Sequence, residues 1–226
     1  AKKVVVNLAP AMVRKKGASF DLPIALAILA SMGIFPERRL RDTLVVGELS
    51  LDGRVKAVPG VLPIVTRAKE EGCRRCIMPE QNAREGALVK GMEILGVGHL
   101  MEACRYLNDE QKIRAVIGGA EYQTHQETEE DLLDYCDIQG QEAVKRATEV
   151  AVAGGHNLLL IGPPGSGKSM MAKRVPTILP PPTLEESIEI TKIYSVLGMV
   201  DKERPLMTGR PFRSVHHTVT KSALIG

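Results

Sequence analysis

The residues best suited to chemistry in this chain form one short run, GPPGSGKS, which ends at Ser169. The run fits the pattern G-x-x-x-x-G-K-[ST], which is typical of a loop that binds nucleotide phosphates. Its glycines would let the backbone turn tightly and aim N–H groups at a phosphate, helped by the positive end of the following helix. Lys168 would neutralise the β- and γ-phosphates, and the Ser169 hydroxyl would bind the Mg²⁺ that accompanies ATP. We expect this phosphate loop to comprise Gly162, Pro163, Pro164, Gly165, Ser166, Gly167, Lys168 and Ser169.

A phosphate loop of this type needs a strand before it and a helix after it. The apolar run at residues 156–161 predicts the strand, with His156 buried at its start, and residues 168–178 predict the helix. Hydrolysis also needs a second strand that ends in an acidic residue and orients Mg²⁺. The candidate after the loop, residues 197–201, contains a glycine and precedes charged residues, so we expect a loop there. The sequence therefore predicts nucleotide binding without the hydrolytic half of the site.

The four cysteines offer a second possible chemistry. Cys73 and Cys76 have the spacing of a redox pair or a zinc knuckle, but no second pair of ligands accompanies them. Cys104 and Cys136 each stand alone. We predict reduced thiols and no metal site at these residues.

The first half of the chain predicts a mixed α/β fold, because short β-like runs alternate with amphipathic helical patterns. Asp52-Gly53 predicts a hairpin turn, and Gly72 predicts the end of a helix. The expected strands are residues 4–8, 43–51, 54–57, 76–78 and 93–96, and the expected helices are residues 20–32, 60–71, 81–89 and 100–107.

Composition limits the class of protein. With 226 residues, 44% of them hydrophobic and 25% charged, the chain can form about two globular domains. Only 3% are aromatic and none is tryptophan, which argues against an aromatic platform for stacking nucleic-acid bases, and the net charge of +3 permits DNA binding without requiring it. The longest apolar stretch, residues 20–35, is interrupted and is shorter than the roughly 20 residues of a membrane span. No leader is visible, so we expect a cytoplasmic protein without membrane contact.

Three further motifs resemble the magnesium-chelatase-like branch of the AAA+ ATPases. They are DIQGQE at residues 137–142, GGHN at residues 154–157, and RPFRSVHHT at residues 210–218, which continues to ALIG at residues 223–226. The last resembles the hallmark between that family's two nucleotide motifs, with Val215 where the family usually has proline. The resemblance implies that Ile138, Gly140 and Gln141 contact the adenine, and that subunits form a hexameric ring in which a neighbour's arginine completes each ATP site.

The hallmark carries several basic residues. The resemblance places His216 and His217 in an insertion that helps to line a central pore, and as neighbours on an extended chain they cannot form a metal pair. Arg210, Arg213 and Lys221 add positive charge that would suit phosphates, or would serve equally as ordinary surface charge.

The front half resembles the proteolytic domain of Lon proteases, an α+β fold of the ribosomal protein S5 domain 2-like type, which the ComM/YifB subfamily carries ahead of its ATPase. GELSLDGRV at residues 47–55 is close to the Lon strand–turn–strand motif, and KKGAS at residues 15–19 places Ser19 at the nucleophile position. Leu62 stands where Lon has its lysine general base, and Lys56 falls on the hairpin instead. Because a Ser–Lys mechanism needs a neutral amine beside the serine, we expect Ser19 to be inactive.

Together these motifs predict a Lon-like domain at residues 1–108, an acidic linker at 109–136 and the first part of an AAA+ domain at 137–226. The chain begins inside an apolar run and ends before the second nucleotide motif, so we expect a part of a longer protein. The resemblance implies an ATP-driven motor for DNA branch migration and translocation. The alternatives are the motor subunit of magnesium chelatase, which drives metal insertion into a porphyrin, a Lon-type protease, or a non-catalytic nucleotide-binding module.

Overall fold

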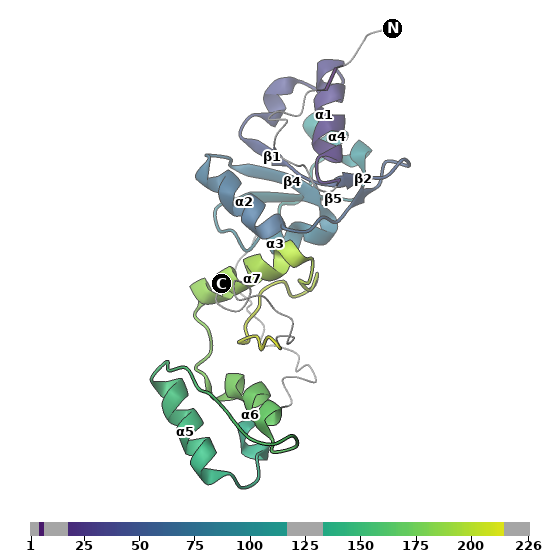
Figure 1. The fold of residues 1–226 in the computed structure, drawn as a ribbon. Coiled ribbons are helices and arrows are strands. Elements are labelled where there is room, and N and C mark those ends of the chain that lie inside the picture. The colour runs from purple at the N-terminus through teal and green to yellow at the C-terminus, as the bar shows by residue number, and fades with distance from the viewer. Residues whose placement is uncertain (1–4, 7–17, 117–132, 215–226) are drawn as a thin grey trace. The chain divides into compact units, whose positions relative to one another are not determined.

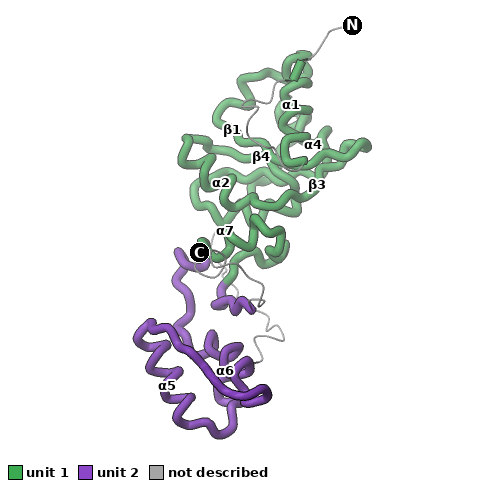
Figure 2. The backbone as a smooth tube through the Cα atoms, in the orientation of Figure 1, with its two compact units in different colours: residues 1–122, 188–207 green, residues 123–187, 208–226 purple. Residues whose placement is uncertain are grey.

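The computed structural model describes residues 5–6, 18–116 and 133–214 (Figure 1). The chain divides into two compact units (Figure 2). The first comprises Ala1–Tyr122 and Ile188–Met207, and the second comprises Gln123–Ser187 and Thr208–Gly226. The expected strand at residues 4–8, most of the acidic linker, and the hallmark from Val215 onward lie outside the described residues, except for Val5 and Val6 of that strand.

A parallel three-stranded sheet forms the centre of the first unit. Its strands are β1 (Thr43–Val45), β4 (Arg75–Pro79) and β5 (Glu93–Val97), in the order β1-β4-β5. The strands are aligned so that Leu44 lies opposite Cys76, which in turn lies opposite Ile94.

Alternate side chains of this sheet enter two separate cores. Ile77 and Leu95 pack with α1 (Asp21–Ser31) and α4 (Leu100–Leu107) in one core. Cys76, Met78 and Ile94 pack with α2 (Val61–Glu70) and α3 (Ala83–Gly86) in the other. Since side chains of a strand alternate between its faces, the two cores lie on opposite faces of the sheet. The unit therefore has three layers, with helices on both sides of the sheet. The mixed α/β class is thereby confirmed, and the Lon-like assignment stays a prediction.

The predicted strand at residues 43–51 is divided at Gly47. β1 stays in the sheet, whereas β2 (Glu48–Leu49) pairs antiparallel with β3 (Val55–Lys56) across the predicted Asp52-Gly53 turn. The Gly47 N–H donates to the Ser19 carbonyl at 3.1 Å, and the Gly47 carbonyl accepts from the Leu22 N–H at 3.0 Å. A Cβ at this position would lie 3.1 Å from the Leu22 side chain. Close contact with the start of α1 therefore interrupts the strand.

Helices α1, α2 and α4 follow the predicted bounds to within two residues, and Gly72 follows α2 with a φ of +91°. The predicted helix at residues 81–89 is shorter than expected. It consists of the 3₁₀ turn η2 (Glu80–Asn82) and the four-residue α3, in which a Cβ on Gly86 would lie 2.5 Å from the Met78 side chain. A further 3₁₀ turn, η1 (Glu37–Leu40), precedes β1.

Two segments outside residues 1–108 pack in the first unit. Ile113 and Ala115 lie against the α1–α4 core, and the Val116 N–H donates to the Ile94 carbonyl at 2.8 Å. The end of α7 (Leu184–Leu197) and the residues after it, up to Met207, also belong to this unit. These boundaries differ from the expected linker and ATPase segments, while the domain assignment as a whole stays a prediction.

The described elements of the second unit are helical: the 3₁₀ turns η3 (Tyr135–Asp137) and η4 (Val175–Ile178), the helices α5 (Glu142–Ala153) and α6 (Lys168–Arg174), and the start of α7. Its small core comprises Tyr135, Ile138 and Met171, with Val144, Leu160 and Ile178 packed against them. Within the described parts of the chain, no helix combines the length and the apolar character that crossing a bilayer demands.

The predicted strand at residues 156–161 is wrong for this structure. These residues have no regular secondary structure, and the side chains of Leu159 and Ile161 are 81% and 86% exposed. A strand requires a neighbouring strand for its backbone hydrogen bonds, and none of the described residues of this unit forms one. His156, predicted to be buried, is exposed, and its ring lies over Gly154.

Candidate functional site

The phosphate loop is held open by glycines in a left-handed conformation. Gly165 has a φ of +78°, and Gly167, at the start of α6, has a φ of +85°. A side chain at either position would meet no neighbour, so the constraint is the backbone conformation itself. Because an L-residue is strained in this region, the tight turn into α6 depends on glycine.

The Lys168 ammonium is directed back onto its own loop. Its Nζ donates to the Gly162 carbonyl at 2.8 Å, to the Pro163 carbonyl at 2.7 Å and to the Ser166 Oγ at 3.1 Å. All three acceptors belong to the phosphate loop, so the loop surrounds the cation on the side of these oxygens. Ser169 follows as an exposed residue of α6.

A pocket of about 500 Å³ joins the phosphate loop to the segment where the family resemblance placed the adenine contacts. From the loop it is lined by Gly162, Pro163, Gly165, Ser166, Gly167 and Lys168, and from the other side by Asp137, Ile138, Gln139 and Gln141. Apolar side chains of Val144, Leu160, Ile161, Met170 and Met171 complete the wall. The structure thus brings two of the three expected base-side residues to the loop. Gly140, Pro164 and Ser169 do not line the pocket.

A strained turn lies among the residues expected to contact the base. Gly140 has a φ of +67°, and Gln141, the N-cap of α5, has a φ of +58°. Positive φ is uncommon for a residue other than glycine, and such strain clusters at functional sites. The turn directs the chain into α5 directly after Ile138, whose side chain is buried with Met171 of α6. The sequence alone did not indicate the conformation of Gln141.

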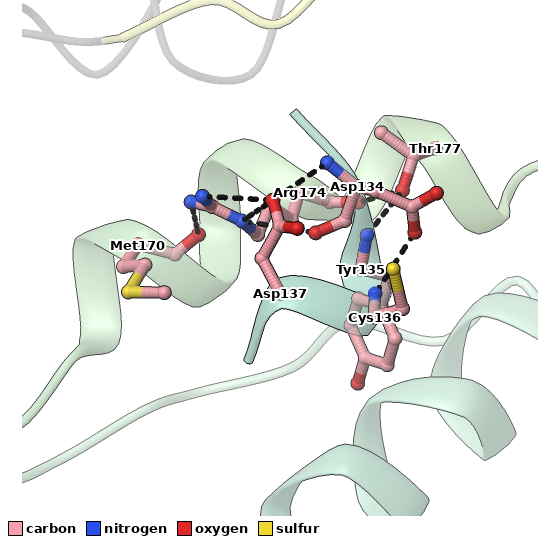
Figure 3. A network of polar contacts seen from close by, with 7 residues as sticks. All are labelled: Asp134, Tyr135, Cys136, Asp137, Met170, Arg174 and Thr177. Atoms are coloured by element: carbon pink, nitrogen blue, oxygen red, sulfur yellow. Dashed lines mark hydrogen bonds and ion pairs between the residues drawn. The ribbon is translucent and has the colours of Figure 1, made fainter. Parts of the chain in front are cut away.

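Residues 134–138 are fixed to α6 and η4 by a polar network (Figure 3). The Arg174 Nε donates to the Asp134 carbonyl at 3.0 Å, and its Nη2 lies 3.2 Å from the Asp137 carboxylate. The Tyr135 N–H donates to the Thr177 Oγ1 at 3.1 Å. Sequence analysis missed Arg174 and Thr177 as members of the site. The D-x-x-D spacing of Asp134 and Asp137, which resembles a capping box, was the available signal.

Hydrogen bonds shift the pKa of two ionisable groups of this network. The Cys136 N–H donates to the Asp134 carboxylate at 2.8 Å, and this bond lowers the pKa of that carboxyl. The Cys136 thiol also bonds this carboxylate, which raises the thiol pKa. Burial raises the pKa of the Cys76 thiol and also keeps the side chain away from solvent. Cys76 is therefore poorly suited to redox chemistry, which needs an accessible thiolate. Among the described residues, no group of three or more His, Cys, Asp or Glu side chains could hold a metal ion.

The residues that the Lon resemblance singled out lie in the first unit. Ser19 is half-buried just before α1, and Leu62 is fully buried in α2. The Lys56 ammonium lies on β3, 3.8 Å from the Glu48 carboxylate. Leu62, the residue that the resemblance aligned with the Lon lysine, is therefore an apolar side chain in the interior, and the loss of the general base stays a prediction.

The described part of the hallmark is tied to the second unit. The Arg210 Nε donates to the Pro180 carbonyl at 2.6 Å, and its Nη2 lies 3.1 Å from the Glu186 carboxylate. The Thr183 N–H and this arginine lower the pKa of Glu186. Arg210 is thus engaged in the unit's own structure, and Arg213 is exposed.

Comparison with known proteins places this sequence in a family. Two protein-family models match the chain. The one described as magnesium chelatase, subunit ChlI, matches residues 134–226, and the one described as subunit ChlI of Mg-chelatase matches residues 1–82. An uncharacterized protein of Mycobacterium tuberculosis is 40% identical over 224 residues, which are 99% of this chain and 44% of that protein. YifB of Escherichia coli is 38% identical over 232 residues, covering 100% of this chain and 43% of YifB.

Competence protein ComM of Haemophilus influenzae is likewise 38% identical over 228 residues, covering 100% of this chain and 44% of ComM. The chain therefore spans less than half the length of these relatives. The similarity extends across both units and includes the phosphate loop and the 137–142 motif. On this evidence the chain belongs to the magnesium-chelatase-like family that includes ComM and YifB.

Proposed function

We propose that the second unit binds an adenine nucleotide with Mg²⁺ in the pocket between the phosphate loop and residues 137–141. The observation that carries the proposal is that a single pocket of about 500 Å³ is lined both by Lys168 and by Ile138 and Gln141. Its size is within the range of small-molecule sites, and its mostly apolar wall with few polar groups is typical of them.

The residues present fit the ligand. Backbone N–H groups of a glycine loop are suited to phosphate oxygens, and the three oxygens that now accept from Lys168 could be replaced by phosphate oxygens. The apolar side chains of Ile161 and Met170 line the pocket and are exposed, which suits contact with a purine ring, and the exposed Ser169 hydroxyl is available to Mg²⁺. Bound Mg²⁺ would neutralise phosphate charge, while Lys168 would hold the phosphates in place.

We propose binding rather than turnover for this chain. Asp201, the acidic residue after the loop that sequence analysis considered, lies outside any strand. Its carboxylate accepts from the N–H groups of Glu203 and Arg204 at 2.7 and 3.0 Å, and these bonds lower its pKa. Asp201 therefore stabilises its own turn and is a poor candidate for orienting Mg²⁺.

Titration calorimetry with ATP and Mg²⁺ tests the proposal. Lys168→Ala should reduce ATP affinity at least about 100-fold, because a charge-assisted contact to phosphate is lost. Lys173→Ala is the matched control, since it removes the same charge from an exposed position on the same helix and should leave affinity within about twofold. Equal affinities for both variants and the original chain would refute the assignment of the phosphate loop.

For the longer protein we propose an AAA+ motor that forms a hexameric ring and drives DNA branch migration, supported by its kinship with a competence protein. The family models favour a second candidate, ATP-driven metal insertion into a porphyrin. A Lon-type protease has less support, because Leu62 replaces the lysine that such catalysis requires.

Two assays on the longer protein separate these activities. We expect ATP-dependent unwinding of branched DNA that Lys168→Ala abolishes, with no metal insertion into a porphyrin in a parallel assay. Metallation without unwinding would favour the second candidate. Efficient labelling of Ser19 by a fluorophosphonate would instead favour the protease as the candidate function.

A further inference from the structure

We propose that Arg174 is a positioning residue that fixes the base-side wall of the pocket to the helix that carries the phosphate loop. The inference rests on the proposed nucleotide site and deepens it, because it assigns phosphate binding and placement of the base to different residues. Lys168 and the loop serve the phosphates. Arg174, which does not line the pocket, determines where the base-side wall lies.

The guanidinium of Arg174 bridges three backbone and carboxylate oxygens. Its Nε donates to the Asp134 carbonyl at 3.0 Å, and Nε and Nη2 approach the Asp137 Oδ2 at 3.4 and 3.2 Å. Its Nη1 also lies 3.5 Å from the Met170 carbonyl, one turn earlier in α6. The side chain of Arg174 is 13% exposed and that of Asp137 is 44% exposed, so the arginine is largely buried while its carboxylate partner still reaches water.

The same carboxylate is also bound from its own segment. The Asp137 Oδ2 accepts from the Asp134 N–H at 3.0 Å, so Arg174 contacts both ends of the η3 turn. Asp137 and the next residue, Ile138, line the pocket. Displacement of the turn drawn in Figure 3 would therefore move the wall of the pocket to which Asp137 and Ile138 belong.

Other contacts hold the turn more weakly or from other elements. The Thr177 Oγ1 donates to the Arg174 carbonyl at 2.8 Å and accepts from the Tyr135 N–H. The Tyr135 hydroxyl donates to the Lys145 carbonyl of α5 at 3.0 Å. These contacts and the small core should keep the unit folded when Arg174 is replaced, while the charged link from α6 to the turn is lost.

The first test compares ATP with inorganic triphosphate, both with Mg²⁺, as ligands of Arg174→Met. We expect ATP affinity to fall about tenfold, because the base-side wall is released, and triphosphate affinity to stay within about twofold, because the loop is unchanged. Arg146→Met is the matched control. It removes an exposed arginine paired with Glu149 on α5 and should alter neither affinity. A parallel loss of both ligands would overturn the proposal, since Arg174 would then support the whole fold.

The second test needs no nucleotide. In the free protein, Arg174→Met should speed hydrogen exchange at the Asp134 and Tyr135 amides about tenfold relative to Arg146→Met, and Arg174→Lys should restore part of the protection. Unchanged exchange would refute the link to α6 whether or not the chain binds ATP. If instead the original chain binds neither ATP nor triphosphate while exchange responds as expected, the nucleotide site fails and the positioning contact stands.

Discussion

At the scale of residues, a buried carboxylate in the first unit has a role that its sequence context did not indicate. Glu85 is 7% exposed, and its Oε1 accepts from the Leu62 N–H at 2.9 Å and from the Ser195 Oγ at 2.5 Å. The Asn82 amide lies 3.4 Å from its second oxygen, and the same amide pairs with the Val58 backbone. Glu85, on α3, thus accepts a hydrogen bond from a backbone N–H in the first turn of α2 that has no partner within that helix.

Glu85→Ala should lower the free energy of unfolding by about 2 kcal/mol, because it leaves buried donors without an acceptor. Urea unfolding followed by circular dichroism measures this change. Glu70→Ala, which removes an exposed carboxylate paired with Arg67, should change stability by less than about 0.5 kcal/mol. Equal effects of the two substitutions would contradict the role of Glu85.

A pH effect belongs to the same scale. The pKa of Asp134 is lower in the folded chain, so its contribution to stability is complete above the ordinary aspartate pKa of about 3.9 and is lost as the pH falls through the lowered value. Amide exchange at Cys136, corrected for the intrinsic pH dependence, should therefore lose protection upon acidification below about pH 4. Asp134→Asn should lack this transition, and a transition that persists in this variant would assign it to another group.

At the scale of elements, the sequence predicted the helices and the hairpin whose bounds depend on neighbouring residues in the chain. Periodicity and terminal glycines identified α1, α2 and α4, and the Asp52-Gly53 turn identified the β2–β3 hairpin. The division of a predicted strand at Gly47 depends on contact with α1, and the strand expected before the phosphate loop depends on a neighbouring strand. Such partners lie far away in the sequence, and periodicity carries no information about them.

The candidate site divides in the same way. The loop motif and the family resemblance identified Lys168, Ile138 and Gln141, all of which line one pocket. Arg174 was missed because its partners lie 37 and 40 residues earlier in the chain. A lone arginine near the end of an amphipathic helix has no pattern that distinguishes it from a solvated residue.

At the scale of the whole molecule, residues 188–207 belong to the first unit although they follow the phosphate loop in sequence. The Gly60 N–H donates to the Ser195 carbonyl at 2.8 Å, and the Lys202 ammonium lies 3.0 Å from the Gln81 side chain. Arg84 also pairs with Glu203. A pocket of about 360 Å³ lies among these contacts.

A disulfide tests this packing. A Cβ on Gly198 would lie 3.8 Å from the Pro59 Cβ, which is the separation that a disulfide requires. The Pro59→Cys/Gly198→Cys variant should form an intrachain crosslink on mild oxidation, detected by peptide mass mapping, despite the cost of about 1 kcal/mol for a cysteine at the positive φ of Gly198. Each single variant serves as a control, and the absence of the linked peptide pair would contradict the placement of residues 188–207.

The resting contacts of Lys168 have a consequence for how the protein responds to ligand concentration. Because the ammonium already has three oxygen partners, the proposed phosphate binding would be an exchange of bonds, in which the loop's own oxygens compete with the ligand. The measured affinity would reflect only the difference between the two sets of bonds. If the second unit binds a nucleotide as proposed, these internal bonds would weaken the binding of small anions, and a ligand that also contacts residues 137–141 would bind more tightly.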